Sequence, residues 1–387
     1  MPLPFEPAGM GHLRLPNRFT RSGTWEGLAA EDGSVTGDLI QATVRLVQGG
    51  VGLIITGFAS VSPGGSSGSR HLSLWDDRYS SGLSSLARAV TGMDGKIVLQ
   101  AGHAGCYSRG CGSQDTIRPG PSTISLPCGP EVREMTCREI HDCEEDFCHA
   151  AGIAKRAGFS GVQIHAAHGY LLSEFLSPFY NHRTDTYGRS PAGRERFLCE
   201  VSRGVRDTVG DRYPVLLKIN SDDYLPGGFS LPDLSDNILS VFHESIDCIE
   251  ISGGSQAAPV RFWPIRPGRI GEGHEGYYRR ASRAFREKTD VPVALVGGIR
   301  SIGTAEGFLS YGIADFISLS RPLIREPDLV QRRQSGNRRI SSCLSCDCCY
   351  RRFVEGRGFG CEIEERTKNQ ASVTEYNNSI PSGGNNG

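Results

Sequence analysis

The stretch GVQIHAAHGY, residues 161–170, sets an apolar run directly before two histidines and a tyrosine. A parallel strand that is covered by helices on both faces reads as a near-continuous apolar run, without the polar alternation of a half-exposed strand. The first seven residues fit that description. We therefore predict a buried strand that carries His165 at its carboxyl end, with His168 and Tyr170 just beyond it.

The same pattern recurs along the chain, each time followed by a glycine-rich or polar loop and a helix-like segment. The other runs are RFTRSG (18–23), VGLIITGFAS (51–60), KIVLQAG (96–102), PVLLKIN (214–220), CIEISGG (248–254), VPVALVGG (291–298) and DFISLSR (315–321). A doubly wound sheet usually stops at five or six strands, whereas eight strand and helix alternations over about 320 residues are typical of a TIM barrel. The sequence therefore predicts an α/β fold, a (β/α)8 TIM barrel.

Three parts of the chain differ in composition. Residues 1–340 carry the strand and helix rhythm and are predicted to form the barrel, and residues 341–365 form a cysteine-rich C-terminal segment. Residues 366–387 are polar, rich in Asn, Ser and Gly, and are predicted to be disordered. The longest loops, 60–75, 103–135 and 255–275, all follow predicted strands, which is where barrel enzymes build their active sites.

Charge and composition exclude several kinds of partner. Lys plus Arg number 42 and Asp plus Glu 43, and this balance gives no electrostatic basis for binding nucleic acid or an anionic membrane surface. No run reaches the roughly 18 apolar residues of a membrane span, and the first residues have no signal-peptide pattern. We expect a cytoplasmic protein that acts on a small molecule, and a homo-oligomer is compatible with the sequence.

Polar side chains gather at the carboxyl ends of the predicted strands. Thr24 follows the first run, Gln100 lies in the third and Lys218 in the fifth. Each unsatisfied polar side chain in a buried strand costs several kcal/mol, so these groups need partners at the barrel mouth. A ligand rich in carbonyl and ring-nitrogen atoms would supply them.

The seventh and eighth runs end in GGIRS and SLSRPL. Gly297 and Gly298 allow a backbone to approach closely, and Arg321 offers a fixed fork of donors. Barrels commonly bind a phosphate between the loops after strands 7 and 8, so we predict a phosphate site here.

The chain resembles the Old Yellow Enzyme group of FMN-dependent ene-reductases, in particular its NADH:flavin oxidoreductase branch. The most specific stretch is GVQIHAAHGYLLSEFLSPFYNHRTDTYGRS, which is similar to the family's H-x-A-H-G-Y-L segment and the P-x-x-N-x-R-x-D-x-Y-G-G run after it. LPNRFTRSGT, LQAGHAG, LLKINSDD, LVGGI and ADFISLSRPLIREPDL are also family-like. The resemblance covers residues 3 to about 362.

The resemblance implies FMN in the barrel mouth and NADH or NADPH as the reductant. Thr24 and Gln100 would then bind the flavin pyrimidine edge, and Lys218 would lie near flavin N1 and C2=O, where many relatives have Arg. The phosphate would lie toward the residues after strands 7 and 8. Those residues are Gly297, Gly298, Ser320 and Arg321.

The same resemblance implies reduction of an activated alkene such as an enone. His165 and His168 would donate to the substrate carbonyl oxygen, and Tyr170 would deliver a proton to the α-carbon. Trp25 is a further candidate for substrate binding. Phe58, Tyr107 and Trp263 are candidate cavity walls, although each fits ordinary packing equally well.

Other interpretations of these residues stay open. A redox-neutral flavin isomerase or cyclase would use the same site, and a barrel aldolase would use Lys218 as a Schiff-base nucleophile. A flavin-binding scaffold without activity is a third. Where several relatives have Pro-Met or Pro-Leu before the flavin-contacting Thr or Cys, this chain has Ser22 and Gly23, and where many have Gly-Arg after strand 8 it has Ser320 and Arg321.

The cysteine-rich segment has a spacing of its own. Cys343, Cys346, Cys349 and Cys361 follow the pattern C-x2-C-x2-C-x11-C, with Cys348 in between. Such thiolates suit zinc or an iron-sulfur cluster, and the segment resembles the cluster-binding part of larger 2,4-dienoyl-CoA reductases, but with x2 in the middle rather than x3. Our prediction assigns no metal and favours a reduced or locally oxidised thiol cluster.

Overall fold

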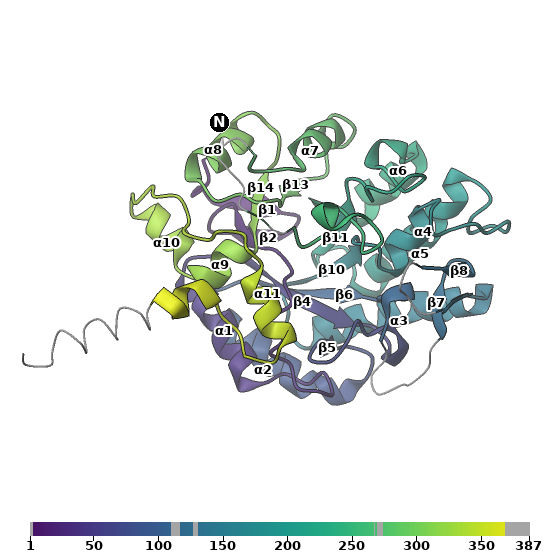
Figure 1. Cartoon of the computed structure of the whole chain (residues 1–387), viewed down its shortest axis with the longest axis horizontal. Coiled ribbons are helices and arrows are strands. Elements are labelled where there is room, and N and C mark those ends of the chain that lie inside the picture. The colour runs from purple at the N-terminus through teal and green to yellow at the C-terminus, as the bar shows by residue number, and fades with distance from the viewer. Residues whose placement is uncertain (1–2, 110–116, 127–130, 267, 269–273, 368–387) are drawn as a thin grey trace, which may run out of the picture.

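The computed structural model describes residues 3–109, 117–126, 131–266, 268 and 274–367. Within this part of the chain, eight parallel strands form a ring in the order β3-β14-β13-β12-β11-β10-β6-β4, closed by pairing of β3 with β4. The strands are β3 (Phe19–Arg21), β4 (Leu53–Ser60), β6 (Ile97–Gly102), β10 (Gly161–Ala166), β11 (Val215–Asn220), β12 (Cys248–Ser252), β13 (Val293–Leu295) and β14 (Phe316–Leu319). Each lies within one of the eight predicted runs, so the predicted TIM barrel is confirmed (Figure 1).

Helices surround the strands, as Figure 1 shows. They are α1 (Gly37–Gln48), α2 (Ser80–Thr91), α3 (Cys137–Arg156), α4 (Leu171–Leu176), α5 (Pro191–Val209), α6 (Asp236–Ser245), α7 (Arg279–Arg286), α8 (Ile302–Ser310), α9 (Arg321–Arg325) and α10 (Leu329–Gln334). Local signals start several of them. Thr136 and Glu139 form a capping box at the start of α3, and Ser190 followed by Pro191 caps α5.

A hairpin closes the amino-terminal end of the barrel. Strands β1 (Ala8–Met10) and β2 (Leu13–Leu15) pair antiparallel. Their buried residues pack against one cluster of inward-facing side chains: Leu53, Ile55, Val98, Leu216, Cys248, Ala294 and Phe316. This apolar floor leaves the carboxyl end of the strands as the open end.

The long predicted loops carry structure of their own. In the loop after β6, β7 (Ile117–Gly120), β8 (Ile124–Ser125) and β9 (Glu131–Glu134) form a small sheet at the edge of the molecule (Figure 1). In the loop after β4, the two-residue strand β5 (Leu72–Ser73) extends that strand's edge. Short 3-10 turns lie at Pro63–Gly65, Asp77–Tyr79, Gly105–Tyr107, Leu231–Asp233 and Val260–Phe262. Two of these turns contribute a residue each, Tyr107 and Val260, to the cavity at the open end of the barrel.

The cysteine-rich segment continues from α10 into the short helix α11 (Cys348–Val354). Disorder was predicted for residues 366–387. Of these, residues 368–387 lie outside the part of the chain that the structure describes. No helix in the described ranges has the length and apolar character needed to cross a bilayer.

Candidate active site

A cavity of about 720 Å³ opens at the carboxyl ends of the barrel strands. Of the residues predicted for the site, it is lined by Thr24, Trp25, Gln100, His165, His168, Tyr170, Lys218, Gly298, Ser320 and Arg321. The suggested wall residues Phe58, Tyr107 and Trp263 line it too. Cofactor and ligand sites commonly enclose roughly 300–1,000 Å³, so the space suits a cofactor together with part of a substrate.

His165 lies at the end of β10, and its ring is held in one tautomer. The backbone N–H of Ala167 donates to His165 Nδ1 over 3.3 Å, so the ring proton belongs on Nε2. Burial, reinforced by the charge of Lys218, lowers the pKa of His165 to about 3. At neutral pH this residue is therefore an uncharged N–H donor.

His168 lies next to His165, with 5.1 Å between the ring centroids. Its backbone adopts φ of +69°, a conformation uncommon outside glycine, and Asn220 Oδ1 accepts its N–H over 3.0 Å. Its Nε2 lies 2.7 Å from Ser252 Oγ. Burial, followed by the charge of Lys218, lowers the pKa of His168 well below its ordinary value, so this imidazole is neutral too.

Tyr170 completes the group. Its ring centroid is 5.0 Å from that of His165 and 5.3 Å from that of Phe58. Burial raises the pKa of the Tyr170 phenol, so the hydroxyl keeps its proton throughout the physiological range. The two histidines and this tyrosine thus present neutral hydrogen donors to one cavity.

Lys218 reaches the cavity from β11 as half of a buried ion pair. Its Nζ lies 3.2 Å from Glu250 Oε2 and donates to Ser22 Oγ over 2.9 Å. Burial opposes ionisation of Glu250, but the charge of Lys218 and hydrogen bonds outweigh it and lower the pKa of Glu250. Among described residues the third ammonium hydrogen has no partner, which leaves it available to a ligand.

Gln100 lies against the backbone of Gly23. A Cβ added to Gly23 would come within 2.4 Å of Gln100 Nε2, so the glycine makes room for the amide. Gln100 Nε2 donates to Gln163 Oε1 over 2.7 Å. The departure at position 23 is therefore matched to the packing of a residue predicted to bind the cofactor.

The predicted phosphate end combines the ends of β13 and β14. Gly298 lines the cavity with φ of +69°, whereas Gly297 lies behind it, and its carbonyl accepts the N–H of Gly276 over 2.7 Å. Ser320 Oγ shares a hydrogen bond of 2.8 Å with Thr24 Oγ1. The Ser320 hydroxyl thus links the predicted cofactor-binding residues after β14 to Thr24, which follows β3.

Arg321 is partly engaged by the cysteine-rich segment. Its Nη1 pairs with Asp347 and donates to the carbonyl of Arg266 over 2.8 Å. The other guanidinium nitrogens have no hydrogen bond within the described part of the chain. Arg321 therefore keeps donors for an anion while Asp347 fixes its position.

The cysteine-rich segment forms one wall of the cavity. Besides Asp347, residues such as Tyr350 and Phe353 line the cavity, and the Trp25 ring lies 6.0 Å from that of Tyr350. The cysteines are free thiols that surround a space of about 20 Å³: Cys343, Cys346, Cys348, Cys349 and Cys361. Across the described residues, no three His, Cys, Asp or Glu side chains are arranged to hold a metal ion.

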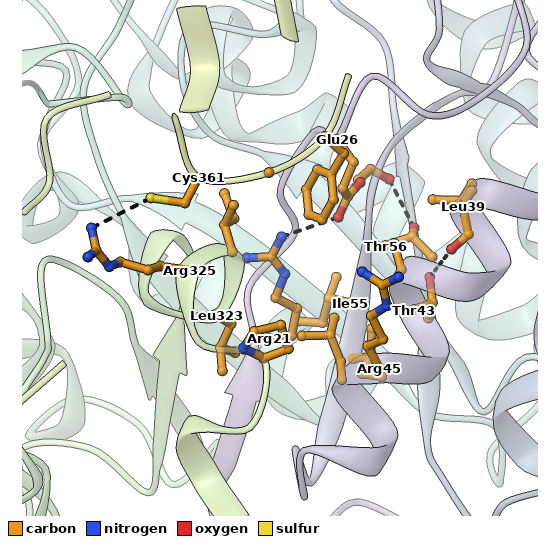
Figure 2. Close-up of a pocket in the computed structure, with 18 of the residues that line it drawn as sticks. Arg21, Glu26, Leu39, Thr43, Arg45, Ile55, Thr56, Leu323, Arg325 and Cys361 are labelled. Carbon is orange, nitrogen blue, oxygen red and sulfur yellow. Dashed lines mark hydrogen bonds and ion pairs between the residues drawn. The ribbon is translucent and has the colours of Figure 1, made fainter. Parts of the chain in front are cut away.

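A second cavity, of about 270 Å³, lies outside the barrel wall between β4, α1, α9 and the segment near Cys361 (Figure 2). Arg21 points into it from β3 and pairs with Glu26 over 3.3 Å. On its other side, Arg21 Nη1 donates to the carbonyl of Ser320 over 2.6 Å. None of the predicted catalytic residues lines this cavity, so the active site is assigned to the barrel mouth.

Four site residues were missed by the sequence reasoning: Gln163, Asn220, Glu250 and Ser252. All are buried polar residues within the apolar runs. Gln163 and Glu250 lie under the cavity floor, and the other two hold His168. The criterion that selected Gln100 and Lys218, a polar residue inside a buried strand, would have found them as well.

The residues present fit FMN. At the cavity floor lie the Lys218 ammonium, which has a free hydrogen, and the Gln100 amide, for which Gly23 leaves room. The carboxyl end of β14 provides the Arg321 guanidinium and the Ser320 hydroxyl. A flavin pyrimidine edge needs a donor and acceptor pair, its reduced form gathers negative charge, and its phosphate favours a guanidinium. This donor set fits a flavin cofactor bound at the mouth of the barrel.

Comparison with known proteins gives the family. A model described as "NADH:flavin oxidoreductase / NADH oxidase family" matches residues 4–339. An NADH oxidase of Thermoanaerobacter brockii is 33% identical over 349 residues, covering 89% of this chain and 52% of that protein. An NADPH dehydrogenase of Clostridium acetobutylicum is 33% identical over 294 residues, covering 76% of this chain and 82% of that protein.

Solved structures agree with this result. A 2-naphthoyl-CoA reductase complex has a TM-score of 0.83 at 25% identity, covering 91% of this chain and 55% of that chain. An old yellow enzyme homologue from Zymomonas mobilis has a TM-score of 0.73 at 25% identity, covering 89% and 96%. The chain spans about half the length of the NADH oxidase and of the naphthoyl-CoA reductase.

The chain belongs to the NADH:flavin oxidoreductase / NADH oxidase family. This is a family of flavin oxidoreductases, and the match agrees with the resemblance to FMN-dependent enzymes found in the sequence.

Proposed function

We propose that this protein uses NADH or NADPH to reduce the C=C bond of α,β-unsaturated carbonyl compounds. The observation that carries the proposal is the convergence of three neutral hydrogen donors, His165, His168 and Tyr170, on the cavity that also contains Gln100 and Lys218. Such donors can give hydrogen bonds to the carbonyl oxygen of the substrate and a proton to its α-carbon.

Gln100, Thr24 and Lys218 would hold the pyrimidine part of FMN, and Ser320, Arg321, Gly297 and Gly298 its phosphate end. FMN held there would supply hydride chemistry for the alkene β-carbon, with NADH or NADPH as the source of the hydride. Lys218 supplies positive charge at this floor, and its pairing with Glu250 holds the ammonium in place.

The two histidines bind and polarise the substrate carbonyl. Nε2–H of His165 is its free donor because Ala167 occupies Nδ1. If the Ser252 hydroxyl donates to His168 Nε2, the ring proton of His168 lies on Nδ1, and this nitrogen becomes the second donor. Loss of one such donor to a developing oxyanion costs roughly a hundredfold in rate.

Tyr170 delivers the proton to the α-carbon. The ordinary phenol pKa near 10 already keeps the group protonated at neutral pH, and burial raises the pKa of Tyr170 further. The edge-on ring of Phe58 limits the phenol's movement on the cavity wall.

Stopped-flow kinetics under anaerobic conditions test the proposal. The purified protein is reduced with NADH or NADPH and then mixed with a panel of enones, in wild type and in Tyr170→Phe. We expect Tyr170→Phe to slow reoxidation by the enone about a hundredfold while flavin reduction stays intact. Tyr107→Phe is the matched control, since that phenol also lines the cavity but bonds to Tyr180.

Two results would contradict the proposal. One is a protein that shows no flavin absorbance near 450 nm even after FMN is added. The other is reduced protein that no enone reoxidises. Turnover of an enone without net NAD(P)H consumption would indicate the redox-neutral isomerase instead, and a borohydride-trapped adduct on Lys218 would indicate the aldolase.

A further inference from the structure

A chain of hydrogen bonds runs beneath the cavity floor across neighbouring strands. Gln100 Nε2 on β6 donates to Gln163 Oε1 on β10 over 2.7 Å, and Gln163 Nε2 donates to Glu250 Oε2 on β12 over 3.2 Å. The same carboxylate oxygen pairs with Lys218 Nζ on β11. Gln100 and Lys218 line the cavity, whereas Gln163 and Glu250 do not. The two inner residues therefore act on a ligand only through the two outer ones.

The direction of this chain follows from the chemistry of its last member. An ionised carboxylate accepts hydrogen bonds and cannot donate, so Gln163 must turn its NH₂ toward Glu250. The carbonyl of Gln163 then faces Gln100, and Gln100 must donate to it through its own NH₂. The group left over is the Gln100 carbonyl, which makes no hydrogen bond to the described residues. Without Glu250, either orientation of both amides would satisfy the same contacts.

We propose that Glu250 is a positioning residue for the cofactor: it makes Gln100 present a carbonyl to the cavity and holds Lys218 beside it. The proposal rests on the placement of the flavin pyrimidine edge over Gln100 and Lys218. That edge carries one N–H between two carbonyls. A carbonyl from Gln100 accepts from the N–H, whereas an inverted amide sets two donors against each other, and Lys218 serves the neighbouring carbonyl oxygen.

The four side chains of this hydrogen-bond chain are buried, and for that reason the orientation of the Gln100 amide affects binding. Gln100, Gln163, Lys218 and Glu250 are each at most 2% exposed, so water does not compensate a wrong contact. A mismatched buried polar group costs enough to weaken binding by roughly ten- to a hundredfold. Within the described ranges Glu250 has Lys218 as its only ion-pair partner, so the carboxylate also balances the buried cation of the floor.

The test measures FMN release from full-length holoprotein on dilution, followed by flavin fluorescence. We expect Glu250→Met, which leaves no acceptor at position 250 for Gln163 or Lys218, to raise the FMN dissociation constant at least about tenfold. The decisive variant moves the carboxylate one step along the chain, Glu250→Met with Gln163→Glu, so that position 250 carries no amide to oppose the Lys218 ammonium. The carboxylate introduced at position 163 would again accept from Gln100 and restore its orientation, so affinity should return to within about threefold of wild type. A loss of packing alone would not be rescued by this exchange.

Two further variants keep the test decisive. Gln163→Leu breaks the chain without changing charge and should weaken binding even if Glu250→Met does not fold. Glu174→Gln changes another fully buried acidic side chain, one that accepts from the backbone N–H of Cys106 outside the cavity, and should leave FMN affinity unchanged. A second readout is the flavin midpoint potential, which should become more positive in Glu250→Met because Lys218 loses its counter-charge.

Unchanged affinity in both Glu250→Met and Gln163→Leu would overturn the inference, as would failure of the exchanged pair to recover. Gln100→Leu and Lys218→Met separate this from a failure of the underlying placement. If those two variants bind FMN normally, the pyrimidine edge does not lie over them. If they weaken binding while the Glu250 variants do not, only the role of Glu250 is wrong.

Discussion

The inside of the barrel has two layers that are built on the same strands and behave differently. Toward the amino-terminal end the inward residues are apolar, such as Leu216, Cys248 and Phe316, and the β1–β2 hairpin seals them. Two residues further along the strands, Leu216 is followed by Lys218 and Cys248 by Glu250. The lower layer packs without polar atoms, and the upper layer joins buried polar groups into pairs and chains.

This difference separates stability from chemistry. A barrel closed by apolar side chains at one end tolerates a costly polar layer at the other, because each polar group there has a partner or faces the cavity. Substitutions in the lower layer should therefore change the free energy of unfolding, and those in the upper layer should change ligand binding and rate.

Phe316→Ala should have the largest effect and should act on stability. Phe316 is 1% exposed, and removing its ring leaves a cavity that costs about 3–5 kcal/mol of unfolding free energy. Chemical denaturation of FMN-saturated protein measures this loss of unfolding free energy. The comparison would fail if this variant folded as stably as wild type but lost FMN.

His165→Ala should have the next largest effect and should act on rate. We expect reoxidation of reduced protein by an enone to slow about a hundredfold, because one donor to the carbonyl is lost. Its loss of stability should be smaller than that of Phe316→Ala, since the ring borders the cavity. His103→Asn is the control, because His103 is also buried but does not line the cavity. Equal rates in wild type and His165→Ala would remove this residue from the mechanism.

Gly23→Ala should have a moderate effect on cofactor affinity. The new Cβ would displace the Gln100 amide, and we expect about tenfold weaker FMN binding with an intact fold. Gly64→Ala is matched to it, because a Cβ at Gly64 meets nothing within 4 Å. Fluorescence titration compares the two. Similar affinities would show that Gln100 moves aside without cost.

The smallest effect should come from pH. The pKa of His165 is lowered to about 3 and that of His168 lies well below its ordinary value, so neither ring gains a proton between about pH 5 and 8. The dissociation constant of a saturated cyclic ketone for the oxidised protein should therefore change less than about twofold over this range. If either ring titrated here, the charged donor would bind the ketone more tightly as the pH falls. Isothermal calorimetry at several pH values distinguishes the two cases.

Much of the fold was predictable because each barrel strand is a local apolar run. The elements that were missed are short. The β1–β2 strands have three residues each, and the sheet of β7, β8 and β9 lies within a stretch without clear periodicity. Such strands are stabilised by what they pack against, so their own residues carry a weak signal.

The sequence predicted residues that line the cavity, but it did not predict the residues beneath the cavity floor. Sequence reasoning placed His165, Tyr170 and Lys218 at one mouth, since carboxyl ends of parallel strands converge there. It did not identify Gln163 or Glu250, whose roles depend on contacts between strands far apart in the chain. Nor did it indicate that Asp347, from the cysteine-rich segment, would meet Arg321.

The sequence by itself determined the barrel and the chemical types gathered at its mouth, because apolar periodicity and strand order are encoded locally and in sequence. The tertiary structure alone decided which polar atoms face one another. Hydrogen-bond direction and charge pairing depend on distances of about 3 Å between strands, which close only when the ring forms. For that reason the orientation of Gln100, the tautomer of His165 and the partner of Arg321 became visible only in the folded molecule.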